Sequence, residues 1–357
     1  MICNLPLNSV SFGQVGAALL RELSKQKKEV QILPIGNLDI SAQKSDEKFE
    51  KWLVERISKT YEELDFTDQA VRLWHIQGSA CQPSLDCSLL TFHETDELTL
   101  SEINLLQQYS RVLVTSKFTQ EVFESYGVKA EYCGLGLDEH NFYPVKRQRM
   151  EGTTVFGLCG KLENRKNTLR ILKLWALKFG NNPNFQLDCL IENPFIKKED
   201  QESLVKQTLE KDYWNINFFS RFPQNMLVND FMNHVDINLT GLSGGEGFNL
   251  PLFNSLALGK WGVALNAHVH KDYCNTENCI LIEPNGKKPA HDGVFFKEGG
   301  RFNQGRFFDF SNDDAISAME EAAKKVGIVN KAGIALKKDF NFKKTINKIY
   351  GEPLEIL

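Results

Sequence analysis

One acidic side chain, Glu246, stands inside a glycine-rich segment, GLSGGEGFNLP, at residues 241–251. The segment runs into an apolar pattern typical of a helix, which Gly259 ends. A glycine-rich turn before a helix presents unpaired backbone N–H groups and the positive end of the helix dipole. This arrangement predicts an anion site, for which phosphate is the usual ligand.

Three cations occupy a second segment, GKLENRKN, at residues 160–167. Lys161, Arg165 and Lys166 follow an apolar run that predicts a strand, just as the glycine-rich segment follows the run at 235–239. On its own the basic segment is also typical of a solvated turn. Ligands of parallel α/β sheets bind at the carboxyl ends of strands, and cations beside a helix N-terminus can neutralise a diphosphate.

The elements that would position these residues alternate along the chain, which predicts parallel α/β architecture. Apolar runs typical of strands lie at residues 29–34, 71–76, 88–92, 111–115, 154–159, 185–191, 217–219, 235–239 and 261–265. Patterns typical of helices lie at residues 15–23, 118–126 (capped by Ser116), 168–179, 226–233, 313–326 and 340–350. A basic, polar segment at 146–152 predicts a linker, so we expect two facing domains with a cleft between them. An aromatic-rich excursion is expected within residues 293–310.

The composition is that of an ordinary globular protein of 357 residues, with 42% hydrophobic and 25% charged residues. Residues 1–150 hold 16 basic against 21 acidic side chains, whereas the remainder is nearly balanced, so neither half predicts a nucleic-acid surface. The eight cysteines form no CxxC pair, which favours reduced and mostly buried thiols. The N-terminus lacks signal-peptide features, and no apolar run approaches the roughly 18 residues of a membrane span. We therefore expect a cytoplasmic protein.

The order of several short motifs resembles that of retaining GT-B glycosyltransferases, specifically glycosyltransferase family four. In the second half the matching pieces are FGLCGK followed by RKN within 156–167, FFSRF at 218–222 and GEGFNLP at 245–251. In the first half they are SFGQVG at 11–16, TFHETD at 91–96, VTSKFT at 114–119 and GLGLD at 134–138. The resemblance implies two Rossmann-like domains, an acceptor domain at 1–150 and a nucleotide-sugar donor domain at 151–335. It also implies a C-terminal helix, within 336–357, that packs back on the first domain.

The resemblance implies transfer of a sugar from a nucleotide-diphosphate sugar to an acceptor hydroxyl, with retained anomeric configuration. Lys161, in a position where the family usually has Arg, and Lys166 would hold the diphosphate as catalytic cations, with Arg165 as a further substrate-binding cation. Glu246 would contact hydroxyl groups of the transferred sugar. Backbone N–H groups that would meet the sugar and phosphate belong to Gly247, Phe248, Asn249 and Leu250.

Five further residues receive roles from the same resemblance. His93 would hydrogen-bond the donor sugar or the acceptor hydroxyl, although a structural role is an equal alternative. Gly13 would let the backbone approach the phosphate, and Arg221 and Phe222 would line a base pocket, with ordinary packing as the alternative for each. Asn254 stands where the family has a second glutamate that binds the ribose, and an amide keeps hydrogen bonding without the charge.

No metal and no other cofactor is expected, because the chain has no Asp-x-Asp motif of the kind that holds a divalent ion on a diphosphate. His268 and His270 alone are weak evidence for a metal site. Besides the nucleotide-sugar donor, the partner would be an acceptor that the sequence leaves open: a glycan, a small molecule, or a DNA base. Two other functions remain open: glycosylation of a hydroxylated base in DNA, and sugar-nucleotide binding without catalysis. The oligomeric state is not predicted.

Overall fold

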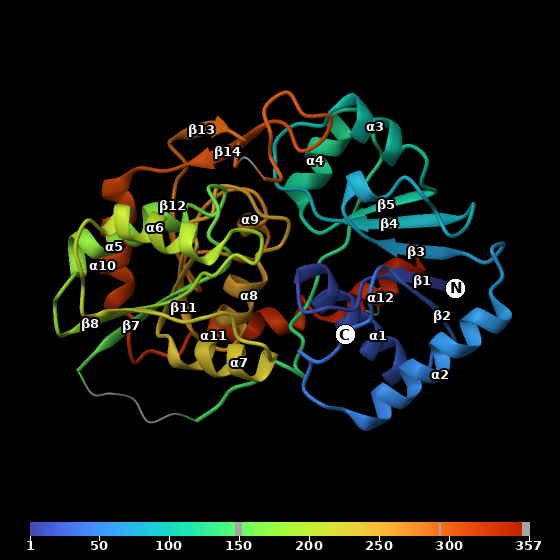
Figure 1. Cartoon of the computed structure of the whole chain (residues 1–357), viewed down its shortest axis with the longest axis horizontal. Coiled ribbons are helices and arrows are strands. Elements are labelled where there is room, and N and C mark those ends of the chain that lie inside the picture. Colours follow the sequence, from blue (N-terminus) through green and yellow to red (C-terminus); the bar gives the residue numbers. More distant parts are fainter. Residues whose placement is uncertain (147–151, 293, 352–357) are drawn as a thin grey trace.

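The computed structural model describes residues 1–146, 152–292 and 294–351, which form two lobes (Figure 1). Each lobe contains one six-stranded sheet, and neighbouring strands in both sheets are parallel. The predicted α/β architecture with two Rossmann-like units is therefore confirmed. The predicted linker at 146–152 falls mostly on residues 147–151, which lie outside the described residues.

The first lobe has the strand order β2-β1-β3-β4-β5-β6. These strands are β1 (Ile2–Leu5), β2 (Gln31–Pro34), β3 (Ala70–Leu73), β4 (Cys87–Thr91), β5 (Arg111–Val114) and β6 (Glu131–Tyr132). The helices of this lobe are α1 (Ser11–Lys25), α2 (Glu47–Glu63), α3 (Leu100–Leu106) and α4 (Lys117–Ser125), with a 3₁₀ turn, η1 (Ile76–Gly78). Ser116 caps α4 as predicted, because its hydroxyl accepts a hydrogen bond from the Thr119 N–H group at 3.0 Å.

The second lobe has the strand order β12-β11-β10-β7-β8-β9. Its strands are β7 (Thr154–Cys159), β8 (Phe185–Leu190), β9 (Ile216–Phe218), β10 (Ile237–Gly241), β11 (Trp261–Leu265) and β12 (Ile280–Ile282). Its helices are α5 (Thr168–Phe179), α6 (Lys198–Leu209), α7 (Asn225–His234), α8 (Leu250–Ala257), α9 (His270–Tyr273), α10 (Asn312–Ala323) and α11 (Lys331–Ala335), followed by the 3₁₀ turn η2 (Leu336–Lys338).

Several elements were not predicted from the sequence, among them α3, β6, α9, β12 and α11. The elements β1, α2 and α6 show the physical reasons. β1 lies at the extreme N-terminus and is too short to show a repeating apolar pattern. Helix α6 buries only Gln201, so it lacks the apolar stripe that predicts a helix. Helix α2 has a narrow apolar stripe around Phe49 and Leu53, and the remainder of the helix is mostly exposed.

The C-terminal helix α12 (Phe342–Tyr350) packs on the first lobe, as the resemblance implied. Figure 1 shows it in red beside the blue α1. The Thr345 hydroxyl donates a hydrogen bond to the Gly134 carbonyl at 2.8 Å, and the Arg111 guanidinium donates one to the Ile349 carbonyl at 2.8 Å. A buried apolar cluster that includes Leu20, Ile346 and Phe253 connects α1, α12 and α8, so both lobes share one core.

A hairpin of β13 (Gly286–Pro289) and β14 (Arg306–Asp309) projects from the second lobe. We call residues 286–309, apart from the undescribed residue 293, the arm. The arm corresponds to the predicted aromatic-rich excursion, and Figure 1 shows it in orange reaching toward α3 and α4. The Thr99 hydroxyl, at the start of α3, donates a hydrogen bond to the Arg301 carbonyl at 2.6 Å, so the arm connects the two lobes.

Two further findings concern the whole described chain. Within these residues, which include all eight cysteines, no disulfide is present and seven cysteines are buried, in agreement with the prediction of buried thiols. No helix in the described ranges is long and apolar enough to cross a membrane.

Candidate functional site

The two segments with predicted chemistry meet because their strands are neighbours. Strands β7 and β10 pair in parallel, so the segments that follow them, 160–167 and 242–249, leave the same edge of the sheet. The Thr240 hydroxyl joins the two strand ends, since it donates a hydrogen bond to the Cys159 carbonyl at 3.0 Å. Lys161, Lys166 and Glu246 therefore lie in segments that leave two directly paired strand ends.

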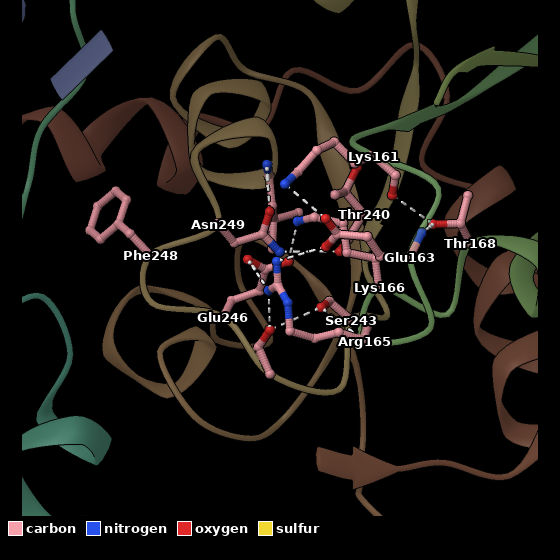
Figure 2. Close-up of polar contacts among 12 residues, drawn as sticks. Lys161, Glu163, Arg165, Lys166, Thr168, Thr240, Ser243, Glu246, Phe248 and Asn249 are labelled. Atoms are coloured by element: carbon pink, nitrogen blue, oxygen red, sulfur yellow. Dashed lines mark hydrogen bonds and ion pairs between the residues drawn. The ribbon is translucent and has the colours of Figure 1, made fainter. Parts of the chain in front are cut away.

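Five side chains form a continuous chain of alternating charge at this edge (Figure 2). Lys161 Nζ lies 2.8 Å from one Glu163 oxygen, and Arg165 Nη2 lies 3.1 Å from the other. Glu246 is held by Arg165 Nη1 at 3.0 Å and by Lys166 Nζ at 2.5 Å. We call these five residues the charge cluster. Three cations and two carboxylates leave it one positive charge in excess.

Burial makes these ion pairs strong. The side chains of Glu246 and Arg165 are 7% and 8% exposed. Burial alone would raise the pKa of Glu246, but the nearby Arg165 and Lys166 outweigh it and hold that pKa well below its usual range. Burial likewise opposes the charge of Arg165, yet Glu246 and Glu163 raise the pKa of Arg165 above its usual value. Both groups are therefore ionised at neutral pH.

Glu163 was not singled out by the sequence analysis, although it is central to the charge cluster. It holds Lys161 and Arg165 apart and in place, and its own pKa is lowered by Arg165, Lys166 and Lys161 against the effect of burial. The alternation of Lys, Glu and Arg at every second residue from 161 to 165 was the available signal.

The glycine-rich segment is packed against the first lobe. A Cβ atom on Gly245 would lie 2.2 Å from the Glu94 carbonyl oxygen, and one on Gly247 would lie 2.6 Å from Phe92 Cβ. The Thr115 hydroxyl also donates a hydrogen bond to the Gly247 carbonyl at 2.7 Å. The glycines therefore permit a close approach between the two lobes at the site.

The start of α8 offers fewer free N–H groups than the sequence suggested. Asn249 has a positive φ of 62° and its side-chain oxygen accepts a hydrogen bond from the Leu252 N–H group at 3.4 Å. Pro251 has no N–H group to offer. Leu250 retains its N–H group at the start of the helix, while Phe248 points away from the charge cluster in Figure 2 and is 3% exposed.

His93 lies two residues after the end of β4, but its imidazole contacts groups of the first lobe. Its Nε2 atom lies 3.0 Å from the Thr95 hydroxyl and 3.0 Å from the Glu97 carbonyl oxygen. The ring also packs edge-on against Phe123 and is 3% exposed. The adjacent Glu94 carbonyl, rather than the His93 side chain, contacts the glycine-rich segment.

Gly13, Arg221 and Phe222 also have close neighbours in the structure. Gly13 lies in α1, where a Cβ atom would be 2.3 Å from the Asn8 side chain. Arg221 donates a hydrogen bond across the lobes to the Ser9 hydroxyl at 2.7 Å. The partly buried Phe222 packs in the shared core and lies among aromatic rings of the second lobe.

Asn254, eight residues after Glu246, is 5% exposed on α8. Its side-chain oxygen has no hydrogen-bond partner among the described residues. A buried and unsatisfied amide oxygen is unusual in a folded protein, and such an atom is often completed by a ligand or a water molecule.

The two histidines after β11 have structural contacts beneath the glycine-rich segment. His268 Nε2 lies 3.0 Å from the Ser243 carbonyl oxygen, and burial lowers the pKa of His268 to about 4. His270 Nε2 lies 2.8 Å from the Asn249 side-chain nitrogen, and burial lowers its pKa as well. Both imidazoles are therefore neutral at pH 7. Among the described residues, no group of three or more His, Cys, Asp or Glu side chains is arranged to hold a metal ion.

The arm also makes an ionic contact with the first lobe, which the sequence did not predict. Asp96 in the first lobe is bracketed by Lys287 at 2.8 Å and Arg306 at 3.1 Å. Its side chain is 5% exposed, and although burial opposes ionisation, the hydrogen bonds from Lys287 and the Arg306 backbone lower its pKa. These ion pairs hold the arm of the second lobe to the first lobe.

Comparison with known proteins identifies the fold. No family model matches the chain, and no curated protein matches it. Sucrose-phosphate synthase from Thermosynechococcus elongatus matches over 98% of both chains, with a TM-score of 0.66 and 13% identity. A glycosyltransferase from Rickettsia africae ESF-5 matches over 98% of this chain and 96% of its own, with a TM-score of 0.64 and 13% identity.

The structure of HepE from Anabaena in complex with UDP matches over 98% of both chains, with a TM-score of 0.64 and 13% identity. HepE in complex with UDP-glucose is similar over the same share of both chains, with a TM-score of 0.62 and 12% identity. These full-length similarities show that the chain has the GT-B fold of glycosyltransferases.

Proposed function

We propose that the protein is a retaining glycosyltransferase that needs no metal ion and moves a sugar from a nucleotide-diphosphate sugar to an acceptor hydroxyl. The observation that carries this proposal is the charge cluster at the carboxyl ends of adjacent strands. There Arg165 and Lys166 hold Glu246, and Glu163 holds Lys161 beside them. In a GT-B fold this edge faces the other lobe. The complexes of HepE with UDP and with UDP-glucose support a uridine-diphosphate sugar as the donor.

The donor diphosphate would exchange partners with Glu246. Lys166, whose side chain is 11% exposed, gives its ammonium to Glu246 in the absence of a ligand. A bound diphosphate would take over Lys166 and Lys161, because phosphate oxygens are strong acceptors for charged donors. Glu246 would keep Arg165 as its buried partner and turn its second oxygen to the hydroxyl groups of the sugar.

This exchange favours the transition state. When the bond between the anomeric carbon and the phosphate oxygen breaks, negative charge grows on the leaving diphosphate. Cations fixed beside that oxygen stabilise the developing charge, and removal of one such donor typically costs about 3 kcal/mol, or roughly a hundredfold in rate. The acceptor would attack from the same face while the leaving phosphate receives its proton. Protein cations would thus supply the charge that a divalent ion supplies elsewhere.

The test uses Lys166→Ala with a panel of UDP-, GDP- and ADP-sugars, and measures donor consumption and nucleotide binding. Lys173→Ala is the matched control, because Lys173 lies on the exposed surface of α5 and pairs with Glu210. We expect Lys166→Ala to lower turnover about a hundredfold, whereas the control keeps the wild-type rate. The proposal is wrong if no panel member is bound or consumed, or if both variants behave alike. Tight binding without turnover would instead favour a binding protein without catalysis.

A further inference from the structure

Two exposed phenylalanines form a pair at the rim of the charge cluster. Phe195 follows β8 and is 56% exposed, while Phe295 belongs to the arm and is 36% exposed. Their ring centroids lie 5.3 Å apart with the rings nearly perpendicular, at 88°. Both rings keep part of their surface exposed to solvent, and we call the pair the aromatic corner.

Hydrogen bonds fix both loops that carry the aromatic corner. The buried Asn193 donates to the Leu162 carbonyl at 3.0 Å and accepts from the Phe195 N–H group at 3.0 Å. On the arm, one Asp292 oxygen accepts from the Phe295 N–H group at 2.8 Å, and Asn303 donates to the Phe295 carbonyl at 3.1 Å. A surface that is ordered before binding costs little entropy when a ligand arrives.

The aromatic corner adjoins the proposed donor site. The Lys161 ammonium lies over both rings as a cation–π contact, with Nζ 5.1 Å from each ring centroid. The same ammonium is paired with Glu163 at 2.8 Å, so it already has a counter-ion. The arm also reaches the first lobe here, because Asn303 contacts the Gln77 side chain at 3.4 Å.

We propose that the aromatic corner binds a sugar ring of the acceptor, and hence that the acceptor is a glycan. This inference rests on the proposed glycosyl transfer, since it names the second substrate of the same site. The C–H groups on one face of a sugar ring are apolar and weakly positive, and they pack on the negative face of an aromatic ring. The nearby amides of Asn303 and Gln77 suit hydroxyl groups, whereas a nucleic acid would require cations without partners along its backbone.

The experiment measures sugar binding by saturation-transfer NMR and titration. The probes are methyl glycosides of glucose, galactose, mannose and N-acetylglucosamine, the disaccharides maltose, cellobiose and lactose, and a DNA duplex containing 5-hydroxymethylcytosine. Variants Phe195→Ala and Phe295→Ala remove one ring each, Phe195→Tyr keeps the ring, and Phe66→Ala is a control at a 62% exposed position of the first lobe. UDP binding is measured for every variant.

We expect at least one sugar of the panel to bind, with saturation of its ring C–H protons. Its Kd should increase at least tenfold in both alanine variants, about 1.4 kcal/mol, and stay within twofold in Phe195→Tyr and Phe66→Ala. The Kd of UDP should change less than threefold. The proposal is overturned if no sugar of the panel binds, if the alanine variants bind it as well as wild type, or if they lose UDP or DNA binding instead. Failure of the proposed function is a separate result, namely that no nucleotide sugar is bound or consumed.

Discussion

The variant Glu246→Gln gives the sharpest test of the charge cluster, because it removes one negative charge and keeps the size of the side chain. Glu246 is the shared partner of Arg165 and Lys166, at 3.0 and 2.5 Å. Its loss should therefore have two opposite effects. The folded protein should become less stable, and the two cations should become more available to a diphosphate.

The expected loss of stability follows from burial. Breaking a buried ion pair costs about 3–5 kcal/mol, and the amide oxygen of glutamine recovers about 1 kcal/mol by accepting one hydrogen bond. We therefore expect a loss of about 2–4 kcal/mol, or a fall in Tm between about 4 and 16 °C for a domain of this size. The pKa of Glu246 is lower in the folded than in the unfolded protein, so its contribution is full above the unfolded value of 4.5. The difference between wild type and variant should shrink as the pH falls below that value.

Thermal unfolding at pH 7 and pH 4, and titration calorimetry with UDP, measure both effects. Glu320→Gln is the control, because Glu320 forms an exposed ion pair with Lys178 and should cost less than about 1 kcal/mol. For Glu246→Gln we expect the Kd of UDP to decrease about tenfold, since a charge-assisted hydrogen bond is worth about 1.5–3 kcal/mol. Sugar transfer should fall about a hundredfold. Equal stability of the two variants, or weaker UDP binding in Glu246→Gln, would refute competition between the carboxylate and the diphosphate.

Three further predictions concern Asn254, Asp96 and His268. Asn254→Ala should lower the free energy of unfolding by about 1 kcal/mol or less, because the amide oxygen has no hydrogen-bond partner to lose. The same variant should weaken UDP binding about fivefold in titration calorimetry. A large loss of stability with unchanged UDP affinity would contradict this prediction. Asp96→Asn should weaken the contact between the arm and the first lobe by about 1–3 kcal/mol, which is measured as faster proteolysis within residues 294–305. A proteolysis rate equal to that of wild type would show that Asp96 does not hold the arm to the first lobe. Burial lowers the pKa of His268 to about 4 from 6.5, so its contribution to stability is full above pH 6.5 and is lost as the pH falls toward 4. Between pH 7 and pH 5, thermal melts should therefore show that the His268→Gln variant loses about 2 kcal/mol less unfolding free energy than wild type. Parallel pH profiles of stability for the two proteins would show that His268 does not have a lowered pKa.

Much of the site was determined by the sequence itself. Apolar runs before Lys161 and Glu246 predicted strands, and parallel strands bring their carboxyl ends to one edge of the sheet. The proximity of Lys161, Lys166 and Glu246 follows from that geometry, and the strands β7 and β10 are indeed neighbours. The C-terminal helix was predictable for a related reason, because its apolar stripe requires a partner surface.

Only the tertiary structure decided which side chains pair and how closely the lobes approach. Glu163 and Asp96 looked like ordinary surface acids in the sequence, yet each is buried between two cations. The partners of Glu246 lie 80 residues away, and those of Asp96 about 200, so no local pattern specifies them. The reason is physical: periodicity fixes which face of an element is buried, whereas loop conformation and packing between lobes fix which charged atoms end within about 3 Å of one another.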